Sequence, residues 1–207
     1  MHAFALAALF AAVLAAHEQN GPPGAPPASS AAGPLKPSGA TESSPAATHD
    51  VRAGVDALLG TREAISPEQW RKLGPAALPV LEEVVEDPKA LSTRRARALE
   101  GMVALRSPHA PALLSRLAQS DSEPFLVRLA AMRGAGRALT PARQVVALRP
   151  ALEKATDVRL RAAAADVLSH HRAGCAAVRD QVKREAAEAG EHFEPALRRC
   201  GSRLGAR

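Results

Sequence analysis

From residue 50 onward, apolar and charged residues alternate in short runs that are typical of amphipathic helices. The run from Ala77 to Asp87 is strongly apolar, with acidic residues between the apolar ones. Ser66 can cap a helix, Pro67 suits its first position, and Gln69 stands where a capping box needs it. The pattern therefore predicts an all-α domain over residues 50–207.

Three of the predicted helical segments are alike. They span residues 96–104, 127–135 and 160–168, and each carries an arginine at its second position. Small residues stand in the middle of each segment, where Ala or Gly lets neighbouring helices approach closely. Pro79 and Pro111 are 32 residues apart and precede similar apolar pairs. Repetition at this spacing predicts an α-solenoid of stacked helical hairpins, with a non-repetitive helical bundle as the alternative.

These segments resemble HEAT repeats, in the short form found in bilin-lyase HEAT-like proteins. Residues 73–81 resemble the second helix of such a unit, and residues 127–131 and 158–164 resemble the first. The resemblance covers roughly residues 67–188 and implies a HEAT-like fold. It implies little about function, because HEAT arrays serve many unrelated roles.

The repeat is less regular toward the end of the chain. The match weakens after Thr140, because Pro150 falls 39 residues beyond Pro111. This spacing predicts an insertion or a degenerate unit. Terminal caps are expected at residues 50–65 and 189–207, where the polar content rises.

The first 49 residues have a different composition. An uninterrupted apolar run of 14 residues, Ala3 to Ala16, is shorter than the roughly 20 that span a bilayer and fits a secretory signal. No Lys or Arg precedes it, so an uncleaved anchor or a misassigned start is the alternative. Residues 17–49 are rich in Pro, Ala and Ser and predict a disordered linker. We therefore expect a signal peptide at residues 1–16 and an exported mature chain, periplasmic or secreted, with no membrane span.

Composition narrows the classes of function. Aromatic residues make up 2% of the chain and Tyr is absent, so Ala, Leu and Val must build the core, which favours close-packed helices. The net charge of +6 comes mostly from Arg, but Arg and Glu alternate along the helices instead of segregating. Because binding of single-stranded nucleic acid also uses aromatic stacking, we expect no nucleic-acid partner.

The two cysteines, Cys175 and Cys200, are a candidate disulfide. In an exported protein an even number of cysteines suggests a bridge. However, a helix running to Glu188 and paired with a helix from Pro195 would hold the cysteines roughly 12 Å apart, beyond the about 7 Å that a bridge tolerates. A shorter first helix would bring them together. A disulfide and two independent thiols therefore both stay open.

Two other polar clusters give weaker signals. The C-terminal region contains several side chains of the kind that bind metals, namely His170, His171, Cys175, His192 and Cys200. Because adjacent histidines on a helix point about 100° apart, His170 and His171 cannot easily share one ion, and we expect no metal site there. The acidic cluster Glu82, Glu83, Glu86 and Asp87 is interpreted as solvated surface.

The sequence contains no nucleophile-elbow, phosphate-loop or zinc-protease motif. HEAT-type hydroxylases carry repeated His-Glu pairs, whereas the one pair in this chain, His17-Glu18, lies outside the repeats. We therefore expect no enzyme activity and no cofactor, and predict a protein-protein interaction module outside the cytoplasm. The alternative, implied by the bilin-lyase resemblance, is a lyase-like or enzyme-accessory role. The expected partner is an unidentified acidic protein or peptide, contacted by Arg94, Arg95, Arg97, Arg128, Arg133, Arg159 and Arg161.

Overall fold

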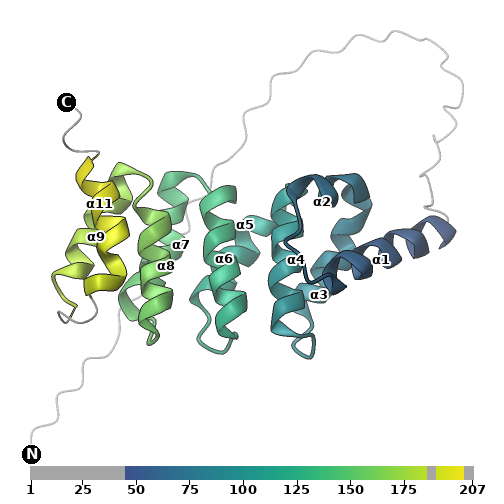
Figure 1. Ribbon diagram of the computed structural model, residues 1–207, viewed down its shortest axis with the longest axis horizontal. Coiled ribbons are helices and arrows are strands. Elements are labelled where there is room, and N and C mark those ends of the chain that lie inside the picture. Colours follow the sequence, from purple (N-terminus) through teal and green to yellow (C-terminus); the bar gives the residue numbers. More distant parts are fainter. Residues whose placement is uncertain (1–44, 186–189, 203–207) are drawn as a thin grey trace, which may run out of the picture. The chain divides into compact units, whose positions relative to one another are not determined.

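The protein is helical throughout the part that its structure describes. A computed structural model describes residues 45–185 and 190–202, which contain helices and no strand (Figure 1). The predicted all-α class is confirmed for these residues. The helices are α1 (Pro45–Gly60), α2 (Pro67–Leu73), the 3-10 helix η1 (Pro75–Ala77), α3 (Leu78–Glu86), α4 (Ser92–Ala104), α5 (Ala110–Gln119), α6 (Phe125–Ala138), α7 (Pro141–Lys154), α8 (Val158–Leu168), α9 (Arg172–Val182), the 3-10 helix η2 (Glu191–Phe193) and α11 (Glu194–Ser202).

The predicted N-terminal segments lie mostly outside the described residues. The signal peptide at 1–16 and the linker up to residue 44 are among those left undescribed. Helix α1 begins at Pro45, inside the range 17–49 that the sequence assigned to the linker. Among the helices that the structure describes, none is both long and apolar enough to cross a bilayer.

Helix α2 begins where the sequence predicts. The Ser66 side chain accepts a hydrogen bond from the Gln69 backbone N–H, and the Gln69 side chain accepts one from the Ser66 backbone N–H at 2.7 Å. This reciprocal cap fixes the first turn and so directs Trp70 inward, where 1% of its surface is exposed. Trp70 packs on Gly101 of α4, where a Cβ atom would lie 3.1 Å from the indole ring. A glycine there lets α4 approach the ring closely.

The later helices pack in two series. Helix α6 packs against both α4 and α8, whereas α7 packs against both α5 and α9. Contacts between α5 and α6 and between α7 and α8 join the two series (Figure 1). Each helix therefore buries one side against its neighbour along the chain and another against the next helix of its own series.

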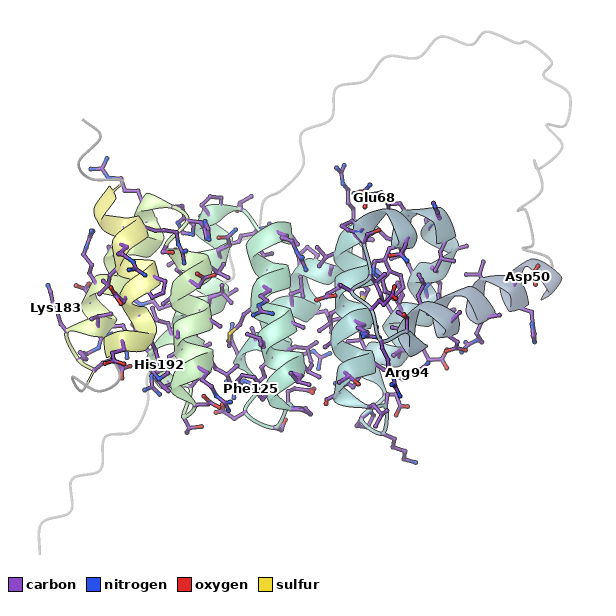
Figure 2. The ribbon with its side chains drawn as sticks, in the orientation of Figure 1. Asp50, Glu68, Arg94, Phe125, Lys183 and His192 are labelled. Atoms are coloured by element: carbon purple, nitrogen blue, oxygen red, sulfur yellow. A yellow bond between two sulfur atoms is a disulfide. The ribbon has the colours of Figure 1, made fainter. Side chains whose placement is uncertain are left out.

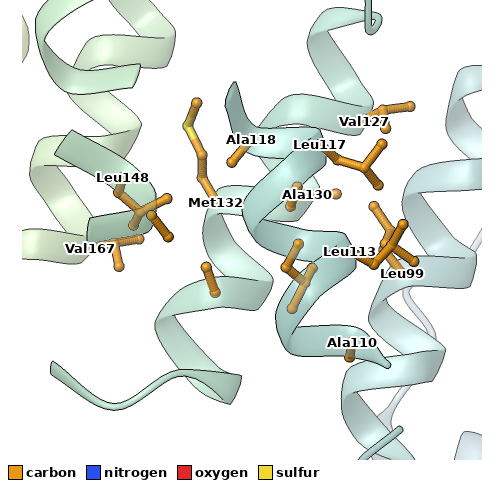
Figure 3. Packing of buried hydrophobic residues seen from close by; sticks show 14 of the residues in the cluster. Leu99, Ala110, Leu113, Leu117, Ala118, Val127, Ala130, Met132, Leu148 and Val167 are labelled. Carbon is orange, nitrogen blue, oxygen red and sulfur yellow. The ribbon is translucent and has the colours of Figure 1, made fainter. Parts of the chain in front are cut away.

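Small aliphatic side chains fill the space between the two series. Leu113 and Leu117 of α5 lie near Leu99 of α4 and Val127 of α6, and all four are buried (Figure 3). At Gly134 of α6 an added Cβ atom would come within 2.7 Å of a Leu114 methyl group. A side chain at this position in α6 would therefore require Leu114 to move.

Prolines stand in the first turns of α3, α5 and α7. Pro79 and Pro111 stand at the starts of α3 and α5, and Pro141 stands at the start of α7. Pro150, which the sequence analysis aligned with Pro111, lies instead inside α7. The 39-residue spacing from Pro111 to Pro150 therefore does not join two helix starts, whereas Pro141 occupies the first turn of α7.

A disulfide joins the two C-terminal helices. The Cα atoms of Cys175 and Cys200 are 5.4 Å apart, within the range of a bridge. Helix α9 ends at Val182 and not near Glu188, so Cys175 near its start lies opposite Cys200 near the end of α11. This is the shorter first helix that the bridge requires. Both cysteines are buried.

The disulfide predicts a redox-dependent stability. It closes a loop with a sequence separation of 25 residues, so replacing both cysteines with Ala should lower the free energy of unfolding by about 3 kcal/mol. Reduction of the unchanged protein should lower it by a similar amount. We expect mass spectrometry to find no alkylated cysteine in protein that was denatured without reduction. In protein that was reduced first, it should find two. Labelling of both thiols before reduction would contradict the bridge.

Candidate binding groove

Two of the seven arginines predicted to contact a partner are buried. Arg95 is 5% exposed, and its Nε donates to the Val85 carbonyl at 2.8 Å. Its guanidinium also lies 2.7 Å from the Glu123 carboxylate. Arg128 is 5% exposed and pairs with Asp121 at 2.7 Å. Both side chains therefore hold together helix ends and loops of the domain itself.

A third arginine of the repeat, Arg161, also makes internal contacts. Its Nε lies 2.8 Å from the Glu185 carboxylate, and its Nη1 donates to the Ala155 carbonyl at 2.7 Å. The hydrogen bonds from Arg161 hold the pKa of Glu185 below its ordinary value of 4.5, and burial opposes that shift. Arg161 thereby connects the start of α8 to the segment after α9.

Two arginines of α4 bind the N-terminal part of the domain. Arg97 donates to the carbonyl of Leu59 in the last turn of α1 and to that of Thr61 just after it. Arg94 pairs with Asp56 of α1 at 2.6 Å. Both side chains therefore connect α4 to α1.

The last two predicted arginines differ from each other. Arg159 pairs with Asp157 at 2.7 Å and lies 4.5 Å above the Phe125 ring. Arg133 is exposed and has no ion pair with any residue that the structure describes. Of the seven, Arg133 is the one whose guanidinium is not engaged inside the domain.

A groove of about 920 Å³ opens at the edge where α4 and α6 end. Figure 2 shows Arg94 and Phe125 at the opposite ends of these helices. The apolar lining comes from α2, α4 and α5 and includes Trp70, Val103 and Pro111. The charged lining residues are Arg71, Glu100, Arg106 and Arg137.

A second hollow of about 550 Å³ adjoins this groove. It shares Arg137 with the groove and extends across α6 to the end of α8. Its charged and titratable lining includes Arg133, Asp166 and His170. Together the two hollows form one surface, called here the Arg137 groove, along the C-terminal ends of α4, α6 and α8.

The Arg137 groove carries an excess of positive charge. Arg71 pairs with Glu68, and Asp166 pairs with Arg199, so these charges are offset. Arg106, Arg133 and Arg137 are exposed and have no ion pair among the described residues. Glu100 is the one lining carboxylate without such a pair. Three unpaired cations thus face one unpaired carboxylate.

Arg106 has a backbone conformation that favours glycine. Its φ is 56°, and it follows α4 at a position where the Ser107 N–H donates to the Met102 carbonyl at 2.9 Å. The Arg106 N–H donates to the Val103 carbonyl at 3.1 Å. This left-handed helix end disfavours any residue with a Cβ atom. The sequence pattern did not indicate Arg106 and Arg137, because neither lies within the three similar segments at residues 96–104, 127–135 and 160–168.

The other predicted polar clusters are held by internal contacts. Cys175 and Cys200 are bonded to each other, and the described residues contain no group of three metal-ligating side chains. The His171 Nδ1 accepts a hydrogen bond from the Gly174 N–H at the start of α9. In the acidic cluster, Glu82 contacts His109, Glu83 pairs with Arg52, and Glu86 pairs with Arg116.

Comparison with protein-family models, with curated proteins and with solved structures finds no match. The resemblance to HEAT repeats therefore stays a prediction from the sequence.

Replacing Arg106 with Gly should stabilise the protein. Glycine adopts the left-handed conformation without the Cβ clash, so we expect the free energy of unfolding to rise by about 0.5–1 kcal/mol. Arg137→Gly is the matched control, because Arg137 lies inside α6 and glycine there should lower stability. Urea unfolding of both variants measures the difference. Equal destabilisation by the two substitutions would refute the assignment.

The Arg161–Glu185 contact predicts a pH-dependent contribution to stability. Because the folded-state pKa of Glu185 lies below 4.5, the contribution is complete above that pH and is lost as the pH falls through the folded pKa. Glu185→Gln should therefore lower the free energy of unfolding at about pH 6, and the deficit should shrink toward about pH 3. Glu86→Gln, in the exposed ion pair with Arg116, should change stability little at either pH. A Glu185→Gln deficit independent of pH would show that charge is not its source.

Proposed function

We propose that this chain is a non-catalytic protein-binding module that acts outside the cytoplasm. Its fold would be a HEAT-like solenoid of stacked helical hairpins. The contacts of α6 with α4 and α8, and of α7 with α5 and α9, support that arrangement. In such arrays successive units present equivalent helix ends side by side, which suits the binding of an extended partner.

The observation that carries the proposal is the Arg137 groove. It crosses the ends of three helices of one series, so its length suits a segment of polypeptide better than a small molecule. Its lining combines apolar walls, such as Val103 and Pro111, with charged side chains. A mixed lining of this kind resembles the surfaces by which proteins bind one another.

Two observations support a location outside the cytoplasm. The apolar run ending at Ala16 has the length of a secretory signal. A buried disulfide between Cys175 and Cys200 is expected in compartments that keep cysteines oxidised.

Site-specific photo-cross-linking of the full chain tests the proposal. A photoreactive residue at Ala138, which is exposed in the groove, should yield a discrete adduct with one partner protein in cells of the native source. The matched control is Val146 of α7, which is 76% exposed and does not line the groove. We expect no discrete adduct from Val146. Equal cross-linking at both positions, or none at Ala138, would overturn the proposal.

A further inference from the structure

We infer that the Arg137 groove binds an extended acidic segment of its partner protein, held by Arg106, Arg133 and Arg137. This inference rests on the proposed function and adds the chemistry of the partner. The three guanidiniums come from the loop after α4 and from the last two turns of α6. A strand-like peptide laid along these helix ends meets the three guanidiniums in turn.

Charge complementarity is the first argument for an acidic occupant. Most arginines that the sequence offered as contacts are already paired with carboxylates or carbonyls of the domain, as with Arg95 and Arg161. The three groove arginines have no such pair among the described residues. They keep their hydrogen-bond donors available, and a carboxylate is the group that a guanidinium binds in a two-pronged geometry.

The backbone of Arg106 is the second, independent argument. The turn after α4 favours glycine, yet the chain has an arginine there whose exposed side chain lines the groove. Its guanidinium has no internal partner in the part of the chain that is described. Backbone strain retained at a residue whose side chain has no hydrogen bond or ion pair among the described residues is typical of binding positions.

The lining favours a peptide over other anions. Nucleic-acid strands are held by stacking on exposed aromatic rings, whereas Trp70 in the groove is 1% exposed. The large exposed apolar side chains that could enter a lipid surface, Leu91, Leu126 and Val146, do not line the groove. The apolar wall at Val103 and Pro111 can instead contact the small side chains between the carboxylates of a peptide.

Replacing Glu100 should change the affinity for an acidic peptide in the opposite direction to replacing the arginines. This carboxylate lines the groove without an ion pair among the described residues, so it repels an acidic ligand. Removing its charge by Glu100→Gln should tighten binding. If the arginines only stabilised the helix ends and bound no ligand, Glu100→Gln would not tighten peptide binding.

The test measures binding of a fluorescent 12-residue peptide of alternating Glu and Ala to the full chain by anisotropy. We expect Arg106→Gly to weaken binding about threefold, although it stabilises the fold, and the triple variant with Arg133→Gln and Arg137→Gln to weaken it about thirtyfold. Glu100→Gln should tighten binding about twofold. Lys89→Gln removes one exposed charge outside the groove and should leave affinity unchanged. Binding should weaken as salt is added.

Two comparison ligands make the outcome decisive. A peptide with Gln in place of every Glu should not bind; equal affinity for it would overturn the acidic assignment. Tighter, arginine-dependent binding of a 12-nucleotide oligothymidylate would also overturn it, in favour of nucleic acid. Failure of the acidic peptide to bind, with a discrete adduct at Ala138, would reject this inference and leave the proposed function standing. Arginine-dependent peptide binding without any adduct at Ala138 would show that the groove takes acidic peptides, but it would overturn the proposed binding of a partner protein in cells.

Discussion

Close approach of helices at positions without bulky side chains is the constraint on which the rest of the structure depends. An added Cβ atom at Gly101 would lie 3.1 Å from the Trp70 ring, and one at Gly134 would lie 2.7 Å from a Leu114 methyl group. With so few aromatic residues, the domain fills its interior with Ala, Leu and Val, and only short distances between helix axes bury such side chains completely. A larger residue at either position would require the facing side chains to shift.

Arginine side chains connect helices to neighbouring helix ends and loops by hydrogen bonds and ion pairs. Arg97 donates to the Thr61 carbonyl after α1, Arg95 donates to the Val85 carbonyl near the end of α3, and Arg161 binds the Glu185 carboxylate after α9. The contact of Arg95 satisfies a carbonyl group that a helix end leaves without a partner. These arginines therefore stabilise neighbouring helices against one another.

The fold class was predictable because its signals are local. The cap formed by Ser66 and Gln69 depends on residues three positions apart, and the interpretation of the central Gly and Ala residues needs only their own segments. The roles of the arginines were not predictable in this way. Arg97 contacts residues 36 and 38 positions earlier, and Arg161 contacts a carboxylate 24 positions later. The predicted separation of the cysteines failed for a related reason, since no residue near Val182 carries a strong helix-stop signal.

The bridge between Cys175 and Cys200 has a mechanical consequence. Helix α11 is the last described element and packs against α8 and α9 by few side chains, such as Phe193 just before it and Ala196 within it. Tension applied beyond Ser202 reaches Cys200 almost at once and passes through the sulfur–sulfur bond into the first turn of α9. A pull on the carboxyl end is therefore borne by a covalent bond, and α11 cannot be peeled away from its neighbours ahead of the rest of the domain.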